Sequence, residues 1–163
     1  GIDGVGATKV FPVWSGGGTV KCTIIASDWR VPNPALISSV QQIIDPAPQG
    51  RGLGEAPIDH VVTIAGVTSE TVDVGTTVTL QAGTTEGQVQ GPIEDAIESY
   101  LAELRQGWAE QEQIIVRVAL IESAILTVPG VIDVTGTTLN GNSSNLTLGT
   151  EVIPVIGSVT VNV

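Results

Sequence analysis

Apolar and polar residues alternate along several short stretches of the chain, and this pattern predicts β-strands. The stretch 9–14 is short and contains a proline, which favours an edge strand because proline has no N–H to donate to a neighbour. The stretch 19–27 is rich in β-branched residues and places Val20, Cys22 and Ile24 on one face. We therefore expect the chain to open with two strands joined by a glycine turn.

Further strands are predicted in the middle and at the end of the chain. The segment 70–81 alternates most clearly, and Gly75 interrupts it, which indicates a β-bulge. The dipeptide Asn140-Gly141 is typical of a tight hairpin turn. The other expected strands are 58–67, a short one at 114–117, 131–139, a short one at 145–148, and 151–163.

The first predicted helix has clear signals at both ends. Asn33 is a suitable capping residue, Pro34 suits the first helical position, and Asp45-Pro46 ends the helix. Between them an apolar stripe recurs with helical spacing, at Leu36, Ile37, Val40, Ile43 and Ile44.

Two more helices are expected after residue 90. The second is predicted to start at Gly91-Pro92 and to stop at Gly107, with Leu101 on its apolar face and Glu98 on the opposite, solvated face. The third is predicted over 118–128, with its packed side formed by Leu120, Ile121, Ala124, Ile125 and Val128.

The order of elements is β-β-α-β followed by β-α-(β)-α-β-β. Strands and helices are mixed without strict alternation, so we expect an α+β fold with small mixed or antiparallel sheets and packed helices. The two-part rhythm predicts two subdomains, 1–67 and 68–163, although no sequence repeat supports this division.

Composition and charge narrow the range of partners. The 163 residues include six Lys and Arg against 17 Asp and Glu, a net charge of −11, which opposes binding to nucleic acid or anionic membranes. The longest apolar runs are too short to span a bilayer, so no membrane insertion is expected. Val, Ile, Thr and Gly are abundant, aromatic residues are scarce, and Met is absent. We expect a soluble fragment or processed product of a longer protein.

Candidate chemistry is sparse. One Cys and one His exclude disulfide frameworks, Cys-cluster zinc sites and two-imidazole metal sites. His60 and Asp59 are neighbours in a predicted strand and therefore point to opposite faces, so they do not form a catalytic pair. The glycine-rich segments 16–19 and 50–54 lack the strand–loop–helix context of phosphate-binding loops, and turns explain them better. We expect no catalytic residue, no metal and no cofactor.

An ordered series of motifs nevertheless resembles a known family. In the first half these are KVFPVW at 9–14, GTVKCTII at 18–25, PALI at 34–37, VQQIIDP at 40–46 and GRGLGEAPI at 50–58. In the second half they are the segments 92–107, 113–122, 128–134 and 145–149. Their order and spacing are similar to those of the baseplate J-like family of phage tail proteins, in the branch found in Gram-positive phages and defective prophages.

The resemblance implies a structural role. Members of this family are wedge components that link the hub and periphery of a contractile-tail baseplate, and they carry no catalytic or metal-binding residues to transfer. It implies that the chain is the C-terminal half of such a protein, that its partners are other wedge and hub subunits, and that assembly takes place in the cytoplasm of the bacterial host. The alternative is a β-rich surface adhesin or carbohydrate-binding module, for which the supply of aromatic residues is small.

Two surfaces are candidates for docking such partners. One is the acidic start of the second helix, with Glu94, Asp95 and Glu98, and the other is the polar loop 47–56, which contains Arg51. Simple solvation of the charges is the competing explanation for the acidic group. Because the net charge opposes self-association, we expect the isolated fragment to be a monomer or at most a weak dimer.

Overall fold

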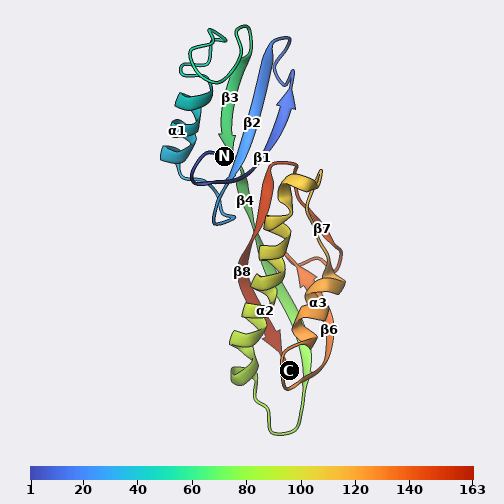
Figure 1. The fold of residues 1–163 in the computed structure, drawn as a ribbon. Coiled ribbons are helices and arrows are strands. Elements are labelled where there is room, and N and C mark those ends of the chain that lie inside the picture. Colours follow the sequence, from blue (N-terminus) through green and yellow to red (C-terminus); the bar gives the residue numbers. More distant parts are fainter. The chain divides into compact units, whose positions relative to one another are not determined.

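The computed structural model describes all residues from Gly1 to Val163 and divides the chain into two compact units. Unit 1 comprises Gly1–Thr68 and unit 2 comprises Ser69–Val163. Helices and strands are mixed in small sheets, which confirms the predicted α+β class (Figure 1).

Unit 1 is a three-stranded mixed sheet with one helix. Its elements are β1 (Val5–Pro12), β2 (Thr19–Ala26), α1 (Pro34–Ile44) and β3 (Val61–Gly66). The sheet order is β1-β2-β3, with β1 antiparallel to β2 and β2 parallel to β3. A parallel pair needs a crossover connection, and α1 with the loop that follows it supplies that connection.

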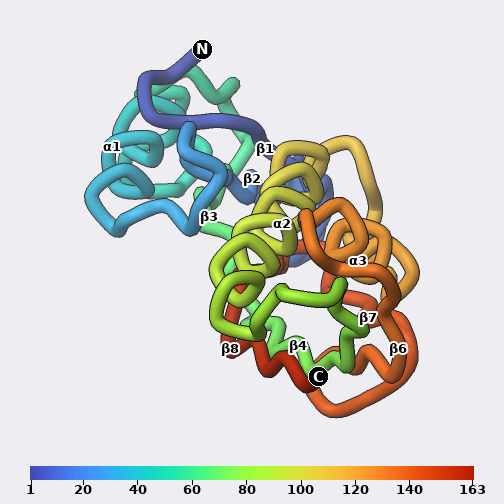
Figure 2. Tube along the Cα trace, turned by 90° about the horizontal axis from the view of Figure 1, so that it is seen from below, coloured from blue at the N-terminus to red at the C-terminus, as the bar shows by residue number.

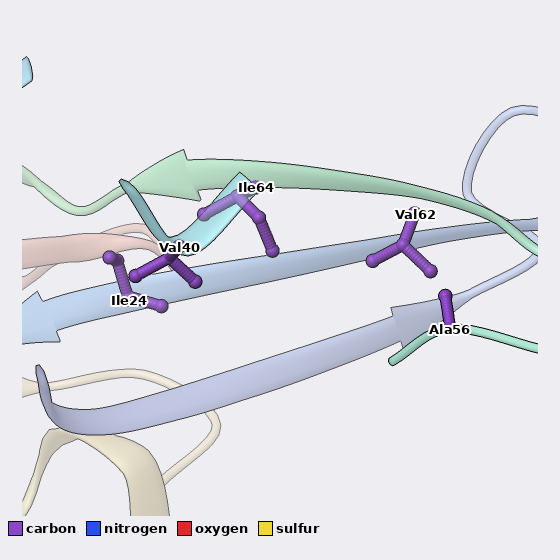
Figure 3. Close-up of a cluster of buried hydrophobic side chains, with 5 residues drawn as sticks. All are labelled: Ile24, Val40, Ala56, Val62 and Ile64. Atoms are coloured by element: carbon purple, nitrogen blue, oxygen red, sulfur yellow. The ribbon is translucent and has the colours of Figure 1, made fainter. Parts of the chain in front are cut away.

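The core of unit 1 lies between α1 and the sheet. Figure 3 shows Val40 of α1 over Ile24 and Ile64 of the sheet, with Ala56 beside Val62 further along. Val20 and Cys22 pack against the same cluster, so the predicted common face of Val20, Cys22 and Ile24 is confirmed. Burial of these aliphatic side chains is the main favourable contribution to the stability of the unit.

Side chains at the two ends of α1 satisfy main-chain groups. The Asn33 side-chain oxygen accepts a hydrogen bond from the Leu36 N–H at 2.8 Å, as expected of an N-cap. At the other end, the buried Asp45 carboxylate accepts from the Val62 N–H at 3.1 Å. Gln41 also binds β3: its side-chain oxygen accepts from the Ile64 N–H, and its side-chain amide donates to the Val62 carbonyl. The predicted start and end of this helix are both confirmed.

Unit 2 contains all the remaining elements, apart from the first residue of β4. They are β4 (Thr68–Leu80), α2 (Glu86–Gln106), the 3-10 turn η1 (Trp108–Glu110), β5 (Ile115–Val116), α3 (Val118–Leu126), β6 (Val131–Leu139), β7 (Leu146–Thr147) and β8 (Val152–Asn162). The main sheet has the order β6-β4-β8, and β5 pairs with β7 in a small second sheet. Helices α2 and α3 lie side by side against the main sheet, α2 along β8 and α3 along β6 (Figure 2).

The core of unit 2 follows the predicted periodicities. Along β4 every second residue from Val72 to Val78 is buried, and along α2 a row from Val89 to Arg105 is buried at intervals of four. Leu101 is completely buried, as predicted. The register of β4 against β6 shifts between Gly75 and Thr77, which confirms the expected bulge.

The turn after β6 also forms as predicted. Asn140 and Gly141 both have positive φ, +48° and +79°, as a tight hairpin turn requires. The N–H and carbonyl of Leu139 bond with those of Asn142 across this turn.

The start of α2 differs from the prediction. The helix begins at Glu86, and Pro92 lies inside it instead of in its first turn. Thr85 and Gln88 form a capping pair at the observed start: the Gln88 side chain accepts from the Thr85 N–H at 2.9 Å, which satisfies a main-chain donor there. Smaller differences are that β1 begins before residue 9, β3 begins at Val61, and α3 ends at Leu126.

Candidate interaction surfaces

The titratable residues with catalytic potential are dispersed. No three His, Cys, Asp or Glu side chains lie close enough together to hold a metal ion. His60 is exposed, and its Nδ1 lies 3.3 Å from the Ile58 carbonyl oxygen, a contact with its own loop. Nothing in this arrangement positions a nucleophile beside a base.

Cys22 lines an apolar cavity in unit 1. The cavity has a volume of about 250 Å³, and aliphatic side chains that include Ile24, Val40 and Ile64 form most of its wall. Burial raises the pKa of the Cys22 thiol above its usual value. A reactive cysteine requires a lowered pKa, so this thiol has the character of a core residue.

The glycines of the loop after α1 are explained by packing. A Cβ at Gly54 would lie 2.5 Å from the carbonyl oxygens of Ile43 and Ile44, so only glycine fits against the end of the helix. Gly50 and Gly52 have positive φ values of +66° and +65°. Arg51, between them, is exposed. These constraints support turns, as predicted, instead of a phosphate-binding loop.

The four sequence-predicted interface residues belong to two different units. Arg51 lies in unit 1, whereas Glu94, Asp95 and Glu98 lie on α2 in unit 2. Glu94 and Asp95 are exposed, and the Gln90 amide donates to the Glu94 carboxylate at 2.6 Å. Because α2 begins at Glu86, these acids lie in its third turn, beyond the range of the positive helix end.

Glu98 does not lie on a solvated face, contrary to the prediction. Its carboxylate accepts from the Arg105 Nη2 at 2.5 Å, and its side chain is 29% exposed against 3% for Arg105. Arg105 Nη1 also donates to the Pro154 carbonyl oxygen at 3.0 Å, which ties α2 to β8. Glu98 therefore serves as the counter-charge of a buried arginine.

Two surface features were not predicted from the sequence. In unit 1 the Lys21 Nζ lies 5.9 Å from the centre of the Phe11 ring and 5.5 Å from that of Trp14, within cation–π range. The register places Phe11 opposite Lys21, a pairing that only the strand alignment reveals. In unit 2 a groove of about 430 Å³ runs between α2 and α3.

Charge is distributed unevenly between the units. Unit 1 has four Lys and Arg and five Asp and Glu, whereas unit 2 has two and twelve. Of the net charge of −11, unit 2 thus carries −10. None of the helices is long and apolar enough to cross a membrane.

Comparison with known proteins identifies the family. The model of the baseplate J-like central domain matches residues 1–66, and that of the baseplate J-like protein C-terminal domain matches residues 72–162. Two Bacillus subtilis proteins are each 32% identical: the phage-like element PBSX protein XkdT over 97% of the chain, and the uncharacterized protein YqbT over 98%. The chain spans 44% of the length of each.

A solved structure shows the same fold. The match is to a chain of the anti-feeding prophage baseplate, with a TM-score of 0.58 and 10% identity, over 94% of this chain and 34% of that one. The two family models cover both units in sequence order. The chain therefore belongs to the baseplate J-like family and comprises its central and C-terminal domains.

Proposed function

We propose that the chain is part of a structural component of the baseplate of a phage or phage-tail-like particle. In this role it belongs to a wedge that links the hub of a contractile tail to its periphery. The observation that carries the proposal is the ordered match of both baseplate J-like domains across the chain. Membership of this family favours the wedge over an adhesin or carbohydrate-binding module. Because the chain spans 44% of XkdT, the proposal concerns the corresponding part of a longer protein.

The role proposed here is binding without catalysis. The lone imidazole contacts its own loop, and the lone thiol faces aliphatic side chains, so neither has the partner that acid–base or nucleophilic chemistry needs. We expect His60→Ala to leave both the melting temperature and particle assembly unchanged.

The partners proposed are other wedge and hub subunits, met during assembly in the host cytoplasm. Glu94, Asp95 and Arg51 are exposed and available for polar contacts with partners. Glu98 instead stabilises the fold through its ion pair with Arg105. The subdomains 1–67 and 68–163 are proposed to fold separately. The high negative charge of unit 2 supports a chain that remains monomeric or weakly dimeric until partners are present.

Deletion and complementation of the gene test this function. In a lysogen induced to make particles, deletion of the parent gene should leave capsids but no complete tails in electron micrographs. The wild-type gene should restore the tails. Complete tails with baseplates in the deletion strain would refute the proposal.

A further inference from the structure

Helix α3 is apolar on almost every side. Seven of its nine residues are Val, Ala, Leu or Ile. A helix that packs one face on a sheet normally has polar residues on the other, whereas a helix that is apolar all round is covered on both sides. Ile121 and Ile125 are fully buried, but Leu120 and Leu126 are 46% and 47% exposed. The outer face of α3 thus has the composition of a covered surface.

The groove between α2 and α3 borders this face. Its lining residues are spaced i, i+3, i+4 and i+7 on each side: Ala96, Ser99, Tyr100 and Glu103 on α2, and Leu120, Ser123 and Ala124 on α3 with its C-cap residue Thr127. This spacing places four side chains in one row along each helix. Most of these side chains are small, which allows the backbone of a third helix to approach closely.

The two walls of the groove differ in charge. On α2, Glu103 lines the groove. The exposed Asp95 lies at the edge of the groove, because it directly precedes the lining residue Ala96. The Ser99 hydroxyl donates to the main-chain oxygen of Asp95, so it does not engage the carboxylate. No Lys or Arg lines the groove. Of the two in unit 2, Arg105 is buried in its ion pair with Glu98, and the exposed Arg117 adjoins the groove through its main-chain N–H, which donates to the Tyr100 hydroxyl. The α2 wall is acidic, and the α3 wall is uncharged, with Leu120 and Ala124 as its apolar side chains.

We propose that this groove binds an amphipathic helix of a partner protein, with apolar side chains against Leu120 and Ala124 and Lys or Arg side chains against the acidic α2 wall. Charge complementarity identifies this occupant, because a second copy of the acidic unit 2 would place like charges together. Helix-in-groove recognition of this kind uses anchors spaced as these rows are. The proposal rests on the proposed function only in that the partner is another tail protein.

The direct test uses two synthetic 21-residue helical peptides. They share one apolar stripe of Leu and Ala, and their polar faces carry only Lys in one and only Glu in the other. Binding of each dye-labelled peptide to the purified chain is measured by fluorescence anisotropy. We expect the Lys peptide to bind and the Glu peptide to bind at least tenfold more weakly. Equal affinities would overturn the proposed occupant.

Leu120→Asp distinguishes the groove from general attraction. The substitution adds a negative charge, so purely electrostatic attraction of the Lys peptide would increase. We expect instead a loss of at least tenfold in affinity, because the apolar contact is removed. The matched control is Ile132→Asp, at a 60% exposed position of β6, which should change the affinity by less than twofold. Unchanged or tighter binding to Leu120→Asp would overturn the proposal.

A second variant guards against loss of folding. Ser123→Trp fills the groove from an exposed position without adding charge, and it should weaken the Lys peptide similarly while circular dichroism and melting remain as in the wild type. Sedimentation of the chain alone tests whether a second copy of the chain occupies the groove. A dimer abolished by Leu120→Asp would assign the groove to a second copy and overturn the proposal. If the Lys peptide binds as expected but the deletion strain still forms complete tails, only the proposed function is refuted.

Discussion

Removal of the Glu98 carboxylate should destabilise unit 2 strongly. In the folded chain Arg105 is almost completely buried, with Glu98 as its counter-charge and the Pro154 carbonyl as a second acceptor. In Glu98→Ala the guanidinium remains in this position, but its charge is no longer compensated. Loss of one partner from a fully buried ion pair costs about 3–5 kcal/mol.

The expected cost here is smaller because Glu98 is partly exposed. Water can replace some of the interaction at a side chain that is 29% exposed, so we expect the free energy of unfolding to fall by about 2–3 kcal/mol. For a unit of this size that corresponds to a fall in melting temperature of roughly 10–20 °C. Glu98→Ala/Arg105→Met, which removes both charges and keeps an apolar side chain, should recover most of the loss.

Urea titration followed by circular dichroism measures these differences. The matched control is Glu103→Ala, an exposed carboxylate on the same helix, which should change the free energy of unfolding by no more than about 0.5 kcal/mol. Equal unfolding midpoints for Glu98→Ala and Glu103→Ala would refute the assignment of Glu98 as the partner of a buried charge. A double variant no more stable than Glu98→Ala would show that the loss arises from packing instead.

Three further outcomes are expected. Leu101→Ala, at a completely buried position, should lower the free energy of unfolding by about 2–5 kcal/mol in the same titration, and a loss below 1 kcal/mol would contradict its place in the core. Asp45→Ala leaves the Val62 N–H without its acceptor and should cost about 1–3 kcal/mol, whereas Glu55→Ala at an exposed site of the same unit should be nearly neutral. Since burial raises its pKa, the Cys22 thiol should react more slowly with iodoacetamide at pH 8 than free cysteine, and equal rates would contradict its burial.

Local chemistry was sufficient to predict several elements. Asn33, Pro34 and Asp45 mark the ends of α1 through contacts within a few residues, and the Asn140-Gly141 turn depends on its own two φ angles. The start of α2 differs from the prediction because proline is favoured in the first turn of a helix, whereas the spacing of Thr85 and Gln88 as a capping pair marks the observed start. Val89 and Ile93, on either side of the exposed Pro92, are both buried, so core packing holds the helix before and after the proline.

The role of Glu98 shows where sequence reasoning was incomplete. Glu98, Leu101 and Arg105 are spaced i, i+3 and i+7, so they share one helix face, and this signal was available in the sequence. The Pro154 carbonyl, 49 residues away, was not predictable from local pattern. Leu120 was expected in the core, but a helix that is apolar all round gives no indication of which side faces the sheet.

Immunogold labelling of intact particles tests the central claim most directly. Antibodies raised against the purified chain would be applied to particles from an induced lysogen that encodes it, with particles from the deletion strain as the control. The proposed function predicts gold at the baseplate, at the end of the tail distant from the capsid. Gold on the capsid, along the tube, or on the surface of bacteria without particles would contradict it.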